Sequence, residues 1–128
     1  MTKVISSILS TIGLCASCAS DVQIRTLTAR QYREALDADR SAVVLDVRRP
    51  DEYKAGHLPE AVSLDYLDQT AFREGMRTLD PKATYYLYCR SGKRSHAAAV
   101  LLQKKGFQVC DMQGGINAWI NDGLPTVK

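Results

Sequence analysis

Three consecutive segments decide the fold: Thr84-Tyr85-Tyr86-Leu87-Tyr88-Cys89, then residues 95–106, then Gln108-Val109-Cys110-Asp111-Met112. The outer two are short and mostly apolar, and we predict that both are strands. The middle segment starts with Ser, continues with strong helix formers and ends with Lys before a Gly, which predicts a helix. Strand, helix, strand is the right-handed crossover unit of a parallel sheet. Parallel sheets bind ligands at the carboxyl ends of their strands, which is where Cys89 lies.

Two further elements are predicted upstream of this unit. Ala42-Val43-Val44-Leu45-Asp46-Val47 is an apolar, β-branched run, typical of a strand that is buried on both faces. Before it, Thr28 and Gln31 have the spacing of a capping box, and the apolar residues that follow share one face, so we predict a helix over 28–38. Because no linker or repeat interrupts these elements, the sequence indicates one α/β domain over residues 21–128.

The composition fits one folded domain and argues against several other classes of protein. The 128 residues are 45% hydrophobic and 24% charged, which suits a chain with a packed core and does not suit a disordered chain. The formal net charge is +3, from 17 Lys and Arg against 14 Asp and Glu, and the sequence has no dense basic run. We therefore expect no nucleic-acid partner.

Residues 1–20 differ from the rest of the chain and resemble an export signal. Lys3 is the only charged residue among them, and residues 4–16 are apolar or carry hydroxyl groups. This run is shorter than a transmembrane helix requires and matches the apolar region of a signal peptide. We therefore expect an exported protein, with an unstructured cytosolic leader as the alternative.

Cys18 is the candidate site of lipid attachment within this leader. The small residues before it resemble a bacterial lipobox, although Cys15 stands where Leu is usual. We expect a periplasmic or membrane-anchored lipoprotein that contacts the membrane only through this lipid. Cleavage after Ala19 or Ser20 and an uncleaved anchor are the alternatives.

Cysteine and histidine spacing argues against a disulfide framework and against a metal site. Only Cys89 and Cys110 belong to the predicted domain, and His57 and His96 are far apart in the sequence. No cysteine pair has a second pair at zinc-binding spacing. We expect neither a metal nor a cofactor.

The turn that follows the second predicted strand has the features of an anion-binding catalytic loop. Cys89 precedes a helix start, where free N–H groups and the helix dipole favour a thiolate. Three cations add to this effect and offer a landing site for an anionic substrate, and a glycine lets the loop curl so that N–H groups point inward. A buried cysteine before a solvated turn is the simpler alternative, but these features rarely coincide without a function. The loop residues are Arg90, Ser91, Gly92, Lys93, Arg94 and Ser95.

With two further motifs, this loop resembles the rhodanese family. The segments Leu45-Asp46-Val47-Arg48, Asp51-Glu52-Tyr53 and Gly56-His57-Leu58-Pro59-Glu60-Ala61 look like its opening signature. Gly114-Gly115-Ile116-Asn117-Ala118-Trp119 looks like its closing signature. The resemblance covers residues 24–125, and it implies a single α/β domain with a central, mainly parallel five-stranded sheet flanked by helices.

The resemblance also implies a sulfurtransferase of the thiosulfate type. The family's loop cysteine takes a sulfane sulfur from thiosulfate or another donor, carries it as a persulfide, and passes it to cyanide or a thiol. By this resemblance Cys89 is the nucleophile and the backbone of residues 90–95 holds the outer sulfur, while Arg90, Lys93 and Arg94 recognise the donor. We expect a monomer, with a small anionic sulfur donor and a thiol acceptor, either a small thiol or a thioredoxin-like protein, as partners.

Other residues of the opening signature receive a structural interpretation. We interpret Asp46, Arg48 and Glu52 as a polar brace that holds the strand end and the turn after it. His57 could act as a base toward Cys89, but the tight turn around it favours a hydrogen-bonded structural role. His96 and Trp119 are assigned no catalytic role.

Two other classes of function stay open at this point. A cysteine phosphatase or arsenate reductase also uses a thiolate in a loop at a helix start, and a catalytically idle module would only dock a partner. Four residues separate Cys89 from Arg94, whereas tyrosine-phosphatase-like loops have five before their arginine, and Ser95 occupies that place. A shorter loop encloses a smaller ring of donors, which suits a single sulfur atom better than a phosphate. The intact cysteine argues against the idle module.

Overall fold

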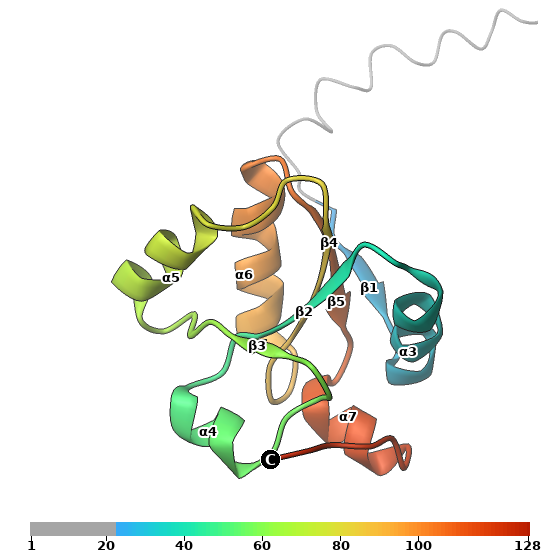
Figure 1. The fold of residues 1–128 in the computed structure, drawn as a ribbon. Coiled ribbons are helices and arrows are strands. Elements are labelled where there is room, and N and C mark those ends of the chain that lie inside the picture. Colours follow the sequence, from blue (N-terminus) through green and yellow to red (C-terminus); the bar gives the residue numbers. More distant parts are fainter. Residues whose placement is uncertain (1–22) are drawn as a thin grey trace, which may run out of the picture.

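The computed structural model describes residues 23–128, which form a five-stranded sheet with helices on both faces (Figure 1). All neighbouring strands are parallel, and their order is β1-β5-β4-β2-β3. This confirms the predicted α/β fold and the central parallel sheet. The strands are β1 (Arg25–Leu27), β2 (Ala42–Asp46), β3 (Val62–Ser63), β4 (Thr84–Tyr88) and β5 (Gln108–Met112).

Within residues 23–128, helices lie on both faces of the sheet, and each face has its own apolar cluster. Phe72 of α5 and Leu102 of α6 belong to the cluster on one face. Tyr32 of α3 and Trp119 of α7 belong to the cluster on the other face. Figure 1 shows α5 and α3 on opposite sides of the sheet. The helices are α3 (Ala29–Ala38), α4 (Pro50–Ala55), α5 (Gln69–Met76), α6 (Lys93–Lys104) and α7 (Gly115–Asn121).

The elements that decide the fold lie close to where the sequence predicts them. The strand at residues 108–112 and the capping box of Thr28 with Gln31 are confirmed. Strands β2 and β4 each end one residue before the prediction, so that Cys89 is the first residue of the following loop.

The predicted helix over 95–106 is displaced, and the displacement moves two cations. The helix begins at Lys93 and ends at Lys104, and its N-cap is Gly92 instead of Ser95. Gly92 has φ +112, a left-handed conformation that glycine adopts without steric cost, so the chain turns into the helix sooner than its polar residues indicate. Lys93 and Arg94 therefore lie in the first helical turn.

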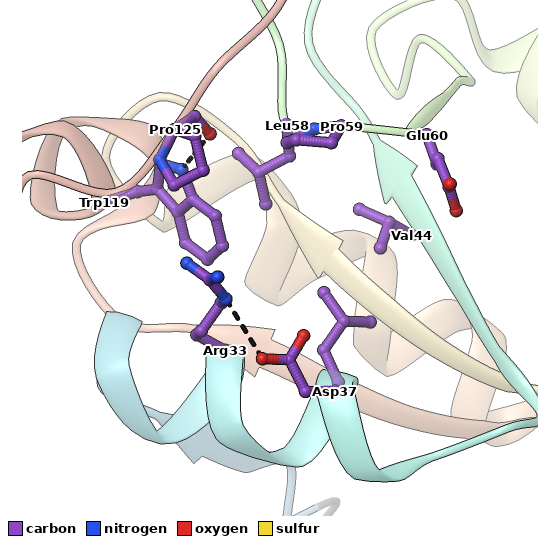
Figure 2. A pocket seen from close by; sticks show the side chains of 9 residues that line it. Arg33, Asp37, Val44, Leu58, Pro59, Glu60, Trp119 and Pro125 are labelled. Carbon is purple, nitrogen blue, oxygen red and sulfur yellow. Dashed lines mark hydrogen bonds and ion pairs between the residues drawn. The ribbon is translucent and has the colours of Figure 1, made fainter.

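A cavity of about 420 Å³ lies on the α3 side of the sheet and is lined by Val44, Leu58 and Trp119, with Arg33, Asp37 and Glu60 around them (Figure 2). It is lined by no residue of the 89–95 loop. Within residues 23–128, no helix is long and apolar enough to cross a membrane. The predicted leader and its candidate lipidation site, Cys18, lie outside the described residues.

Candidate active site

The candidate site is built around the sulfur of Cys89, at the carboxyl end of the central strand β4. The backbone N–H of Gly92 donates to Cys89 Sγ at 3.0 Å, so the loop curls back over the sulfur. The cysteine is only 1% exposed. A reagent must therefore reach the sulfur through the loop that surrounds it.

The loop also offers backbone donors that no protein group uses. In residues 23–128, no acceptor is found for five of its N–H groups, and the first main-chain bond of the helix runs from His96 N to Gly92 O. Free N–H groups in a curled loop at a helix N-terminus form a binding site for negative charge. The five groups belong to Arg90, Ser91, Lys93, Arg94 and Ser95.

Helix α7 holds the start of the cysteine loop in place, and this contact explains the glycines of the closing signature. The N–H of Ile116 donates to Cys89 O at 2.9 Å, and that of Asn117 donates to Arg90 O at 3.2 Å. Gly115 has φ +61, and a Cβ there would overlap the carbonyl groups of Cys89 and Arg90. Only a glycine lets the two backbones approach this closely.

Asp46 and Arg48 form a buried ion pair beside the loop. Arg48 Nε donates to Asp46 Oδ1 at 2.9 Å and Arg48 Nη2 donates to Asp46 Oδ2 at 2.7 Å. The hydroxyl of Tyr88 also donates to Asp46 Oδ2 at 2.6 Å. Burial, reinforced by the Asp46 carboxylate, raises the pKa of Tyr88, so this hydroxyl keeps its proton. Arg48 Nη2 reaches Gly56 O at 2.6 Å and ties the pair to the turn after α4.

Arg94, which the resemblance implies in donor recognition, forms an ion pair with Glu52. Its two terminal nitrogens donate to the two oxygens of Glu52 at 2.7 and 3.1 Å. This bidentate bond lowers the pKa of the Glu52 carboxyl and fastens the first turn of α6 to α4. Arg90 and Lys93 are exposed and have no ion-pair partner among residues 23–128. They are the loop cations available to a ligand.

The histidines do not contact the sulfur. The ring of His57 stacks on Tyr53 with centroids 3.8 Å apart, and its Nδ1 lies 2.9 Å from Tyr53 O. Its backbone pairs with Val127, which fastens the C-terminal segment. His96 is exposed in the first turn of α6. These contacts give His57 the structural surroundings that its turn motif predicts.

The other groups to consider are the thiol of Cys110 and the side chains that could bind a metal. Cys110 is fully buried in β5, and burial raises the pKa of its thiol. In the described part of the chain, no three His, Cys, Asp or Glu side chains gather as a metal site would require. Cys89 and Cys110 do not form a disulfide.

Comparison with known proteins now assigns the chain to a family. The rhodanese-like domain family matches residues 28–122. The chain belongs to the rhodanese-like family. The YtwF protein of Bacillus subtilis is 32% identical over 104 residues, which cover 81% of this chain and 98% of that protein. A protein of Allochromatium vinosum named sulfurtransferase is 30% identical over 105 residues, which cover 81% of this chain and 95% of that protein.

A solved structure shows the same fold. The rhodanese-related protein of Thermoplasma volcanium superposes with a TM-score of 0.72 at 31% identity, over 80% of this rhodanese-like chain and 97% of that chain. Membership and fold therefore agree with the motifs that the sequence carries.

Two features of this rhodanese-like site were not found from the sequence. The hydroxyl of Tyr88 bonds across to β2, which no local pattern shows. Asp111 is 2% exposed and lies in β5, where the sequence analysis assigned it no role. A charged residue inside an otherwise apolar strand was the signal that could have drawn attention to it.

Proposed function

We propose that this rhodanese-like protein is a sulfurtransferase that carries a sulfane sulfur as a persulfide on Cys89. Thiosulfate or a related anionic compound is the donor, and cyanide or a thiol is the acceptor. The observation that supports this most directly is the curled loop around Cys89 Sγ, in which Gly92 N–H already donates to sulfur. Five further N–H groups in the same loop have no acceptor among the described residues.

In the first half-reaction the thiolate of Cys89 attacks the outer sulfur of thiosulfate. A sulfur–sulfur bond forms between them, the bond inside thiosulfate breaks, and sulfite leaves with that electron pair. The charge is balanced, since a thiolate and a dianion give a persulfide anion and a dianion. The free N–H groups of the loop stabilise the persulfide anion, and Arg90 and Lys93 attract the incoming donor.

In the second half-reaction the acceptor attacks the outer sulfur of the persulfide. Cyanide takes that sulfur and becomes thiocyanate, and the electron pair of the broken sulfur–sulfur bond returns to Cys89 as a thiolate. A thiol acceptor, small or carried by a thioredoxin-like protein, becomes a persulfide in the same way. The Asp46–Arg48 pair and the Glu52–Arg94 pair contact no reacting atom in this scheme, and they hold the loop in its curled shape.

Parallel assays of turnover test the proposal. The purified protein is assayed with thiosulfate and cyanide, and separately with an aryl phosphate. We expect thiocyanate formation that Cys89→Ser abolishes and that the matched variant Cys110→Ser retains, with negligible phosphate release. Phosphatase activity that depends on Cys89 would replace sulfur transfer by phosphoryl chemistry, and no turnover of either substrate would favour a partner-binding module.

We also propose that the protein is exported and that Cys18 carries a lipid. The supporting observation is the leader's composition, a single charge followed by an apolar run before Cys18. Labelling of host cells with a fatty-acid probe should mark the wild type but not Cys18→Ala. An unlabelled protein that keeps its leader would contradict the proposal.

A further inference from the structure

Asp111 is a buried carboxyl group that the proposed reaction does not use, and it lies beside the loop. In the sheet, Asp111 is level with Leu87 of the neighbouring strand β4. Cys89 is two residues further along, so its side chain points to the same face of the sheet as Leu87, where both belong to one cluster. Strand spacing and rise place such diagonal neighbours about 8 Å apart.

The carboxyl of Asp111 is poorly compensated where it lies. It is 2% exposed, and its Oδ1 has no hydrogen-bond partner among the described residues. Burial raises its pKa, while the hydroxyl of Ser95 and the imidazole of His96 act in the opposite direction. Ser95 is itself a fully buried residue of the loop. A buried carboxyl with an unpaired oxygen costs stability, so its presence needs a reason.

The same carboxyl lines a groove that reaches the loop. This groove has a volume of about 400 Å³ and runs between β1, the end of β5 and the start of α6. Gly92, whose N–H contacts the sulfur, is one of its walls. Asp111 thus lies behind the part of the loop that receives negative charge. The lining residues are Thr26, Ser91, Gly92, Lys93, His96, Asp111, Gln113 and Gly114.

We propose that Asp111 is a specificity-determining residue, whose carboxylate beside the loop favours monoanionic sulfur donors over dianionic ones. This inference rests on the proposed function. A negative charge at this distance repels every anion that enters the loop, and the repulsion energy is proportional to the charge of the ligand. Thiosulfate brings two negative charges, whereas an alkyl thiosulfonate or an organic persulfide brings one. Arg90 and Lys93 attract both kinds of donor, and Asp111 penalises the dianion twice as much.

Among the described residues, Asp111 has Cys110 beside it in β5, and its negative charge acts to raise the pKa of that thiol. His96 and Lys93 line the same groove from α6, and the imidazole of His96 acts to lower the pKa of Asp111. From β1 and β4 the neighbours are the uncharged Thr26 and Leu87. On the other face of the sheet, Tyr32 of α3 interacts weakly with it across β5.

The test compares two donors in the wild type and in Asp111→Asn, with cyanide as the common acceptor. Thiosulfate is the dianion and methanethiosulfonate is the monoanion, and each delivers one sulfur to Cys89 and releases sulfite or methanesulfinate. At about pH 8.5, where a carboxyl is ionised, we expect the variant to raise kcat/KM for thiosulfate about 3–10-fold. The gain for methanethiosulfonate should be about the square root of that value. The gain for both donors should shrink as the pH is lowered, because burial raises the pKa of Asp111 and a proton then removes its charge.

Matched variants separate this effect from general causes. Asp37→Asn removes the same charge from an exposed site on α3. It should change kcat/KM for thiosulfate and for methanethiosulfonate by no more than about 1.5-fold. His96→Gln removes the imidazole beside Asp111, and the gain from Asp111→Asn should persist in that background. Asp111→Ser is a second neutral variant, should the amide pack poorly.

The outcomes distinguish this inference from the proposed function. Absence of Cys89-dependent turnover in the wild type would overturn the sulfurtransferase proposal itself. With an active wild type, equal gains for the two donors, no gain, or a gain independent of pH in both neutral variants would overturn the role of Asp111 alone.

Discussion

The protein buries two cysteines on neighbouring strands to almost the same degree, Cys89 at 1% exposure and Cys110 at 0%. Cys110 lies inside β5, in the apolar cluster with Tyr32 and Trp119, and burial raises the pKa of its thiol. Cys89 follows the end of β4, and its sulfur accepts a hydrogen bond from Gly92 N–H. Burial therefore does not distinguish Cys89, the proposed nucleophile, from Cys110.

What differs is the fate of the backbone around each sulfur. Cys110 lies in a strand that is paired with β1 on one side and with β4 on the other, so the N–H groups around it serve the sheet. Past the strand end, the loop after Cys89 has N–H groups without acceptors, because a helix start leaves its first donors unpaired. A deeply buried thiol can still have free hydrogen-bond donors beside it if it lies where a strand ends and a helix begins.

Replacing each cysteine in turn by serine should give the largest difference between the two. After incubation with thiosulfate, Cys89→Ser should carry no added sulfur in intact-mass measurements, whereas the wild type and Cys110→Ser should each gain one sulfur atom. The reason is that the loop after Cys89 contains backbone N–H groups with no acceptor among the described residues. An added sulfur on Cys89→Ser would show that Cys110 accepts sulfur despite its surroundings.

The substitution Gly115→Ala should displace the loop around Cys89. The sulfur of Cys89 would then lack free N–H groups beside it, as the sulfur of Cys110 does. The added Cβ would overlap the carbonyl groups of Cys89 and Arg90, and the φ of +61 at this position is unfavourable for alanine. We expect kcat/KM for thiosulfate to fall more than about tenfold and the free energy of unfolding to fall by about 2–4 kcal/mol.

Gly123 provides the matched control for this variant. Its φ is +76, but no atom lies within 4 Å of a Cβ built there. Gly123→Ala should cost about 1 kcal/mol of stability from backbone strain and leave turnover unchanged. Equal effects of the two variants on turnover would refute the steric explanation.

Glu52→Gln should loosen the loop around Cys89 without touching the sulfur. Since Arg94 lowers the pKa of Glu52, the pair stabilises the folded state above the ordinary carboxyl pKa of about 4.3, and this stability is lost as the pH falls through the lower, folded-state value. We expect a loss of about 1–2 kcal/mol in unfolding free energy at about pH 7 and almost none at about pH 2.5, by urea titration.

The control is Glu74→Gln. Its partner Arg77 lies 3.9 Å away, and both side chains are largely exposed. Its effect should stay below about 0.5 kcal/mol at either pH. A pH-independent loss in Glu52→Gln would mean that packing and not the ion pair holds the loop.

The smallest effect is expected from Lys93→Ala, which alters the approach to Cys89 and leaves the loop intact. The side chain is exposed and has no ion-pair partner among residues 23–128, so its charge acts at long range. We expect the KM for thiosulfate to rise about 2–3-fold at low salt, with kcat unchanged and a weaker dependence on ionic strength. An unchanged KM would mean that Lys93 does not attract the donor and that Arg90 and the backbone N–H groups do.

Several elements of the structure could be predicted from local patterns in the sequence. The capping box of Thr28, the apolar run of β2 and the strand at residues 108–112 depend on neighbours a few positions apart, and they appear where they are predicted. The start of α6 was misplaced because Ser95 has the chemistry of an N-cap. A left-handed Gly92 starts the helix first, and sequence chemistry does not reveal which of two competing starts the loop adopts.

The sequence alone was enough to predict the strand–helix–strand unit of residues 84–112, the helix and strand before it, the family motifs, and a cysteine at a strand end with cations after it. These follow from periodicity and from short spacings, which are properties of adjacent residues. Only the tertiary structure decided which charges are free. Arg94 looks identical to Arg90 and Lys93 in the sequence, yet it is engaged by Glu52, 42 positions away. Likewise, only the register of β4 and β5 brings Asp111 beside the cysteine loop, because the partners of a buried charge are set by packing between elements that are distant in the chain.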